Sequence, residues 1–185
     1  MVFIFFVSST MSCQNRETQE KEAHLKSVVE NWLNKKLIIP DSLTIYAPFL
    51  NYIADSVQLS NAKIKIYSHI NASCPTCIRD IELWNNIIPN FEKLKVPIIL
   101  ICESDDNFEL FKFMCDKREI KSFSYPFFFD LKRAFYKQNK FMKESTHFET
   151  VLTDSDNNIL LLGNPIRSKE MQVIYLKEIQ NRIEE

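Results

Sequence analysis

Hydrophobic and polar side chains alternate along part of this chain and recur at helical spacing along much of the rest. Residues 63–70 alternate, which predicts a strand with one buried face. Residues 96–102 are almost continuously apolar, which is typical of a central strand covered on both faces. Three further strands are predicted at 125–129, 150–153 and 159–162. The last two flank a turn of Asp, Ser and Asn residues and should form a hairpin.

Helical spacing predicts the elements that lie between and around these strands. After the first strand, one helix face carries Ile78, Ile81, Trp84, Ile87 and Ile88. Pro89 should stop or kink this helix. Four other helical stretches are predicted at 17–36, 105–118, 131–140 and 166–183, the second of them capped by Asp105, Asp106 and Asn107. Residues 37–39 look like a short strand or edge segment, and 40–62 show no clear period, although 43–46 could be extended.

This order of elements predicts an α/β domain, and the composition supports one of ordinary size. The chain has 185 residues, of which 45% are hydrophobic, including fifteen Phe. Such a chain can build a sizeable core without disulfide staples. We therefore expect one domain with an N-terminal extension.

Charge and glycine content exclude two classes of function. The 23 basic and 24 acidic residues leave a formal charge of −1, so no net field attracts nucleic acid. Gly163 is the single glycine, whereas phosphate-binding loops need several glycines for the backbone to approach the anion. Nucleic-acid binding and nucleotide chemistry on a glycine-rich loop are thus not expected.

The segment Cys74-Pro75-Thr76-Cys77 carries the candidate chemistry. It lies where the first strand gives way to a helix, and Pro75 suits the first helical turn. A helix N-terminus stabilises a thiolate, so Cys74 is the expected nucleophile of a redox pair. Cys77, one turn further, is expected to be more buried and to resolve a mixed disulfide.

Zinc binding is the chemical alternative, because zinc sites use the same Cys-x-x-Cys spacing. Such a site needs two more ligands, and the isolated candidates are Cys102, Cys115, His69 and His147. None of them has a recognisable ligand spacing, so we predict no metal site. Cys102 and Cys115 are expected to be buried free thiols, with a disulfide between them left open.

The N-terminus contains a second pattern. An apolar run at 2–7 is followed by small residues and then by Cys13, which resembles a bacterial lipoprotein signal peptide. The resemblance implies that Cys13 is lipidated and that the chain is anchored to a membrane, facing the periplasm. Thr10 stands where Leu is usual, and no Lys or Arg precedes the run. The alternative is an ordinary N-terminus in which Cys13 is an unmodified thiol.

The strand order, Cys74-Pro75-Thr76-Cys77 and the segment 148–154 together resemble the thioredoxin superfamily, in particular its membrane-anchored lipoproteins. The resemblance covers 63–185 and implies a thioredoxin-like three-layer α/β/α sandwich with a central mixed sheet. Residues 1–13 would then be a signal segment. Residues 14–62 would be a polar tether, an amphipathic helix and an extended addition, which together give an N-terminal helical extension.

The resemblance implies a thiol–disulfide oxidoreductase that acts on protein disulfides in an extracytoplasmic compartment. It needs no cofactor, and its partners would be protein thiols and disulfides or a redox partner protein. The alternative is a non-catalytic lipoprotein of the same fold that binds a partner with the same surface.

Three positions depart from the family pattern. Family members carry a cis-proline just before the hairpin strand, where this chain aligns Phe148 after His147 in the expected substrate-facing loop. We expect a trans bond between these two, because a cis bond without proline costs about 2.5–4 kcal/mol. His147 could shuttle protons or simply be solvated. Ser68 replaces a buried acid, and Ser73 replaces an aromatic residue.

Overall fold

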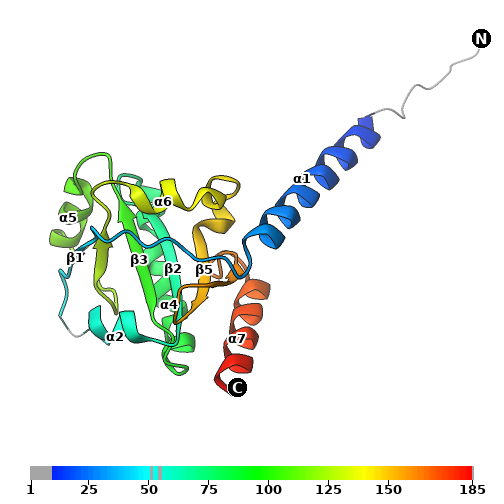
Figure 1. Cartoon of the computed structure of the whole chain (residues 1–185). Helices are drawn as coiled ribbons and strands as arrows, with labels where there is room; N and C mark the ends of the chain where they lie inside the picture. Colours follow the sequence, from blue (N-terminus) through cyan, green and yellow to red (C-terminus); the bar gives the residue numbers. More distant parts are fainter. Residues whose placement is uncertain (1–9, 51, 54–55, 185) are drawn as a thin grey trace, which may run out of the picture.

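A computed structural model describes residues 10–50, 52–53 and 56–184. Six strands form one sheet in the order β1-β4-β3-β2-β5-β6 (Figure 1). Their bounds are β1 (Thr44–Tyr46), β2 (Ile64–Asn71), β3 (Ile98–Glu103), β4 (Phe127–Phe129), β5 (Thr150–Asp154) and β6 (Ile159–Leu162). Strand β2 pairs in parallel with β3 and antiparallel with β5, so the sheet is mixed, as predicted.

The helices also follow the predicted order, with one addition. Their bounds are α1 (Thr10–Trp32), α2 (Ser56–Asn61), α3 (Pro75–Ile78), α4 (Asp80–Glu92), α5 (Glu109–Asp116), α6 (Ala134–Gln138) and α7 (Lys169–Glu184), with 3₁₀ turns η1 (Lys140–Lys143) and η2 (Thr146–Glu149). Helix α2 was not predicted from the pattern. Helix α4 does not stop at Pro89 but continues to Glu92.

Helices cover both faces of the sheet, which makes three layers. The crossovers from β2 to β3 and from β3 to β4 run in one direction, so α4 and α5 lie on the same face. Cys102 of β3 faces α5, where it is within electrostatic reach of Cys115. His69 of β2 points to the opposite face and stacks on Tyr136 of α6, with ring centroids 4.7 Å apart.

Strand β2 differs from its prediction, because it is buried on both faces rather than on one. Its polar residues Lys65 and His69 are only 2% and 6% exposed. The reason is its place in the middle of the sheet between two helical layers. Lys65 avoids an unpaired buried charge by donating from Nζ to the carbonyl oxygen of Ser155 at 3.0 Å.

The N-terminal extension is tied into the domain. Strand β1 pairs with β4 at the sheet edge. Leu37 is buried, and its amide donates a hydrogen bond to the carbonyl oxygen of Asn157 at 2.8 Å. Residues 37–39 form no strand, although Lys36 makes one bridge to Asn158. The segment 14–62 thus supplies both an edge strand and core residues.

Helix α1 projects from the domain and attaches through its last turns (Figure 1). Val28 is buried, and Trp32 packs on Phe141 with ring centroids 4.9 Å apart. Within the described ranges, no helix combines the length and the apolar character needed to cross a bilayer. The apolar run at 2–7 lies outside the described residues, and Cys13 falls within α1 with its side chain undescribed.

Candidate active site

The turn between β2 and α3 holds the Cys-x-x-Cys motif at a helix start, as predicted. Asn71 ends β2, and its side-chain oxygen accepts a hydrogen bond from the amide of Ser73 at 3.0 Å. Its carbonyl oxygen accepts from the amide of Cys74 at 3.2 Å. Cys74 is the N-cap of α3, and Pro75 occupies the first helical turn, where its missing N–H leaves no bond unmade.

Cys74 and Cys77 are both half-buried free thiols, with clearly different surroundings. The sulfur of Cys74 accepts a hydrogen bond from the amide of Cys77 at 3.4 Å and lies 3.0 Å from the hydroxyl of Thr76. Hydrogen bonds from the side chains of Cys77 and Thr76 lower the pKa of the Cys74 thiol. A lowered pKa makes more thiolate at neutral pH, which is the form that attacks a disulfide.

The second thiol is held in the opposite state. Burial, followed by the hydrogen bond and charge of Cys74, raises the pKa of Cys77 to about 12. Cys77 therefore holds its proton more tightly than Cys74 does. The two thiols thus differ in how readily they ionise.

Ser73, which replaces an aromatic residue of the family pattern, connects two loops. Its hydroxyl donates to the Asp106 carboxylate at 3.1 Å and accepts from the amide of Asp105 at 2.8 Å. The same carboxylate accepts from the amide of Leu110 at 3.0 Å in the first turn of α5, although the N-cap of this helix is Phe108 and not one of the three predicted residues. Ser73 thus ties the turn before Cys74 to the loop after β3.

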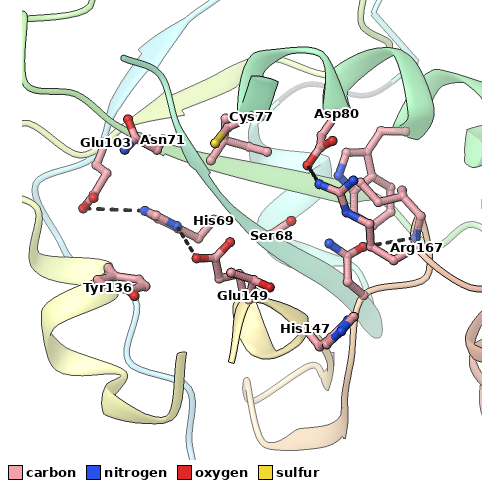
Figure 2. Close-up of a pocket in the computed structure, with 15 residues that line it drawn as sticks. Ser68, His69, Asn71, Cys77, Asp80, Glu103, Tyr136, His147, Glu149 and Arg167 are labelled. Carbon is pink, nitrogen blue, oxygen red and sulfur yellow. Dashed lines mark hydrogen bonds and ion pairs between the residues drawn. The ribbon is translucent and has the colours of Figure 1, made fainter. Parts of the chain in front are cut away.

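A cavity of about 360 Å³ lies beside Cys77 (Figure 2). It forms where β2 and the chain before β5 diverge, since their pairing ends at Ser68 and Thr150. Ser68, in place of a buried acid, shares a hydrogen bond with the Thr150 hydroxyl at 2.8 Å. Acids nevertheless line this cavity, and they come from other positions: Asp80, Glu103 and Glu149.

His69 stands between two of these acids on the far side of the cavity. Its side chain is 5% exposed, with Nε2 3.5 Å from the Glu103 carboxylate and Nδ1 3.9 Å from the Glu149 carboxylate. Burial acts to raise the pKa of Glu103, but the neighbouring His69 and Arg133 outweigh it, so this pKa is lowered. For Glu149, burial prevails and its pKa is raised.

Asp80 lies on the near side, in the first turn of α4. Its carboxylate accepts a hydrogen bond from the guanidinium of Arg167 at 2.5 Å, which joins α4 to the loop after β6. Burial raises the pKa of Asp80, and Arg167 opposes this shift without cancelling it. The side chain of Asp80 is only 14% exposed, so its carboxylate is largely screened from water.

The loop before β5 requires a correction for Phe148. This side chain is 6% exposed and does not line the cavity, so it is not a substrate-facing residue. The physical reason is the η2 turn, whose three-residue period places Thr146 and Glu149 on the cavity side and Phe148 in the core. His147 lies exposed at the cavity rim. No cis peptide bond occurs in the described ranges, so the trans bond before Phe148 is as predicted.

The charged residues of the cavity were not singled out from the sequence. Asp80 follows Cys77 by three positions, a helical spacing that could have been noticed. Glu149 directly precedes β5 and belongs to the motif segment, whereas Arg167 carries no local signal. Among the described residues, no group of three or more His, Cys, Asp or Glu side chains could hold a metal ion.

Comparison with known proteins identifies the fold of this chain. No protein-family model matches the chain, and no curated protein matches its sequence. A crystal structure assigned as the thiol:disulfide interchange protein DsbE from Chlorobium tepidum is similar, with a TM-score of 0.50 and 11% identity. The match covers 80% of this chain and 99% of that chain. The protein has a thioredoxin-like fold.

Two other solved structures are similar at lower scores. A solution structure assigned as a protein disulfide isomerase from Bacteroides thetaiotaomicron has a TM-score of 0.48 and 13% identity, covering 83% of this chain and 91% of that one. A thioredoxin-like protein from Bacteroides caccae has a TM-score of 0.44 and 15% identity, covering 92% and 57%. The match to the Chlorobium tepidum structure and the sheet itself confirm the predicted fold class: a mixed six-stranded thioredoxin-like sheet with an N-terminal helix.

Proposed function

We propose that this thioredoxin-like protein is a thiol–disulfide oxidoreductase that acts on protein disulfides through Cys74 and Cys77. The observation that carries the proposal is the asymmetry of the pair. Cys74 is hydrogen-bonded at its sulfur and has a lowered pKa, while its neighbour one turn along has a pKa raised to about 12. A pair of this kind separates the attacking thiol from the resolving thiol.

The reduction of a substrate disulfide proceeds in two exchanges. The Cys74 thiolate attacks one substrate sulfur, a mixed disulfide forms, and the other substrate sulfur leaves with the electron pair as a thiolate. Cys77 then loses its proton and attacks the sulfur of Cys74. The Cys74–Cys77 disulfide forms, and the second substrate thiolate leaves. The reverse sequence oxidises a substrate dithiol.

Thiol trapping across a series of glutathione redox buffers tests this function. We expect Cys74 and Cys77 to interconvert between dithiol and disulfide with a single midpoint. Cys77→Ser should accumulate a mixed disulfide on Cys74 with glutathione, and Cys74→Ser should abolish exchange. Cys115→Ala is the matched control, because this thiol lies outside the motif, and it should leave the midpoint unchanged. A pair that never interconverts would show a non-catalytic binding protein instead.

We also propose that the chain is a lipoprotein. It would be anchored through Cys13 to a bacterial membrane and would face the periplasm, an extracytoplasmic compartment. The support is the sequence pattern of residues 1–13. Cleavage before Cys13 would leave residues 13–32 of α1, about 30 Å of helix, between the anchor and the domain. Radiolabelled palmitate supplied to bacteria that express the full chain should label the wild type. Cys13→Ala should remain unlabelled, and equal absence of label in both would contradict the anchor.

A further inference from the structure

A second cavity lies at the end of the sheet where the parallel strands β2 and β3 begin. It has a volume of about 810 Å³, which is within the usual range for small-molecule sites. Ile64, the first residue of β2, lines it, whereas the Cys-x-x-Cys turn follows Asn71 at the other end of this strand. The eight residues of β2 span roughly 25 Å. The two cavities are therefore separate, and a role for the second does not depend on the proposed redox function.

Segments that are far apart in the sequence enclose this second cavity. Among them are α2, the loop between α4 and β3, and the last turn of α7, and Figure 1 shows α2 and the end of α7 at the lower side of the molecule. The buried side chains of Leu59, Ile64 and Val96 give the cavity an apolar interior, while Gln58 and Asn61 of α2 add polar groups to its wall. Such an interior favours a hydrocarbon chain, because apolar surface is then removed from water.

Positive charges outnumber negative charges among the described residues that line the cavity. Lys63, Lys95 and Arg182 are exposed at its mouth, where Glu92 is the one acid of the lining. The ammonium groups of Lys63 and Lys95 form no ion pair or hydrogen bond with any described residue. Arg182 donates from Nε to the Glu178 carboxylate at 2.7 Å, and its terminal nitrogens have no partner in the described ranges. The mouth therefore attracts an anion.

Tyr125 adds a polar group to the otherwise apolar interior. The residue is only 2% exposed, and its hydroxyl makes no hydrogen bond with the described part of the chain. Burial, followed by the charge of Glu92, raises the pKa of Tyr125 to about 12, so the hydroxyl remains a donor at neutral pH. The effect of Glu92 also means that this hydroxyl lies within electrostatic reach of the mouth. A buried donor without a protein partner is costly unless a molecule in the cavity accepts its hydrogen bond.

We propose that this cavity binds a fatty acid, with its carboxylate at the mouth beside Lys63 and Lys95 and its hydrocarbon chain against the apolar interior. The carboxylate also accepts a hydrogen bond from the Tyr125 hydroxyl and so supplies the partner that this donor lacks. The site selects both parts of the molecule. A neutral or cationic head would leave the lysine charges without an anion, and a short polar anion would leave the interior in contact with water.

Calorimetric titration of the purified full-length protein with dodecanoate tests this site. We expect one bound molecule per chain. The affinity should rise about fourfold for each CH₂ group added between octanoate and dodecanoate, because each added group buries more apolar surface. Binding that depended on charge alone would show no such dependence on chain length.

Charge reversal at the mouth gives the sharpest test. Lys63→Glu combined with Lys95→Glu should weaken dodecanoate binding by about tenfold or more. The same double variant should bind dodecylamine more tightly than the wild type does, because the ammonium head then meets opposite charges. Lys93→Glu is the matched control, since it makes the same charge change at an exposed residue that does not line the cavity. It should leave dodecanoate affinity within about twofold of the wild type, because salt screens distant charges.

Two single substitutions test the remaining contacts. Tyr125→Phe keeps the ring and removes the hydroxyl, so dodecanoate should bind about fivefold more weakly. Glu92→Gln removes the negative charge at the mouth, so dodecanoate should bind about threefold more tightly. Far-UV circular dichroism and urea unfolding of each variant show whether it is folded.

Three results would overturn the proposal. The first is a wild-type protein that binds no dodecanoate at about 1 mM. The second is equal dodecanoate affinity in the wild type and in the double lysine variant. The third is a loss in Lys93→Glu as large as that in the double variant, which would show a response to net charge rather than to this cavity.

Discussion

Two pairs of cysteines lie in this molecule, and their surroundings differ sharply. Cys74 and Cys77 occupy the turn after β2, half-buried beside a polar cavity. Cys102 and Cys115 lie between β3 and α5, with exposed fractions of 0% and 7%. Burial raises the pKa of both thiols in the second pair, that of Cys115 to about 12. Closeness of two thiols therefore does not make them reactive.

The difference comes from what each region offers a thiolate. The turn supplies hydrogen bonds to the Cys74 sulfur from the amide of Cys77 and from the Thr76 side chain. In the interior, a hydrogen bond from Tyr46 acts to lower the pKa of Cys115, but burial outweighs it. A charge is stabilised at the first site and penalised at the second.

Alkylation rates should separate the two regions most strongly. At pH 7, iodoacetamide should label Cys74 more than about 1,000-fold faster than Cys102 or Cys115, because only Cys74 is both accessible and readily ionised. Mass spectrometry of peptides from the reduced protein measures the rates. In guanidinium chloride the rates should converge. A native Cys115 labelled within tenfold of Cys74 would contradict the comparison.

The same substitution should cost far more stability in the interior than at the turn. Cys102→Ser places a hydroxyl in an apolar interior and should lower the free energy of unfolding by about 1–3 kcal/mol. Cys74→Ser, at a half-buried turn, should change it by less than about 0.5 kcal/mol. Urea unfolding of both variants measures the difference, and equal losses would show that the turn is as tightly packed as the core.

A smaller effect should follow from removal of one hydrogen bond at the reactive site. Thr76→Val deletes the hydroxyl that helps to lower the pKa of Cys74, so this pKa should rise. The alkylation profile of Cys74 should shift to higher pH, with a rate about fivefold lower at pH 7, the equivalent of roughly 1 kcal/mol. Thr76→Ser keeps the hydroxyl and should restore the wild-type profile. An unchanged profile in Thr76→Val would assign the stabilisation to the side chain and the amide of Cys77.

Local patterns predicted most of the elements, because each depends on a few neighbouring residues. The run at 96–102 became the buried strand β3, and the helix after Cys74 formed from its apolar stripe. Predictions were wrong where the tertiary context prevails. Strand β2 alternates in sequence yet is buried on both faces, because it lies between two helical layers. Phe148 was expected to face a substrate, but the three-residue period of η2 turns it inwards.

The sequence by itself determined the place of Cys74 and Cys77, since two thiols at a strand-to-helix junction require only residues that are close in sequence. The cavity that serves this pair is a product of the tertiary structure alone. Asp80 and Arg167 are 87 positions apart, and His69 meets acids from β3 and from the turn before β5. No local pattern predicts such contacts between distant residues, because they form only when the sheet brings the ends of separate strands to one edge.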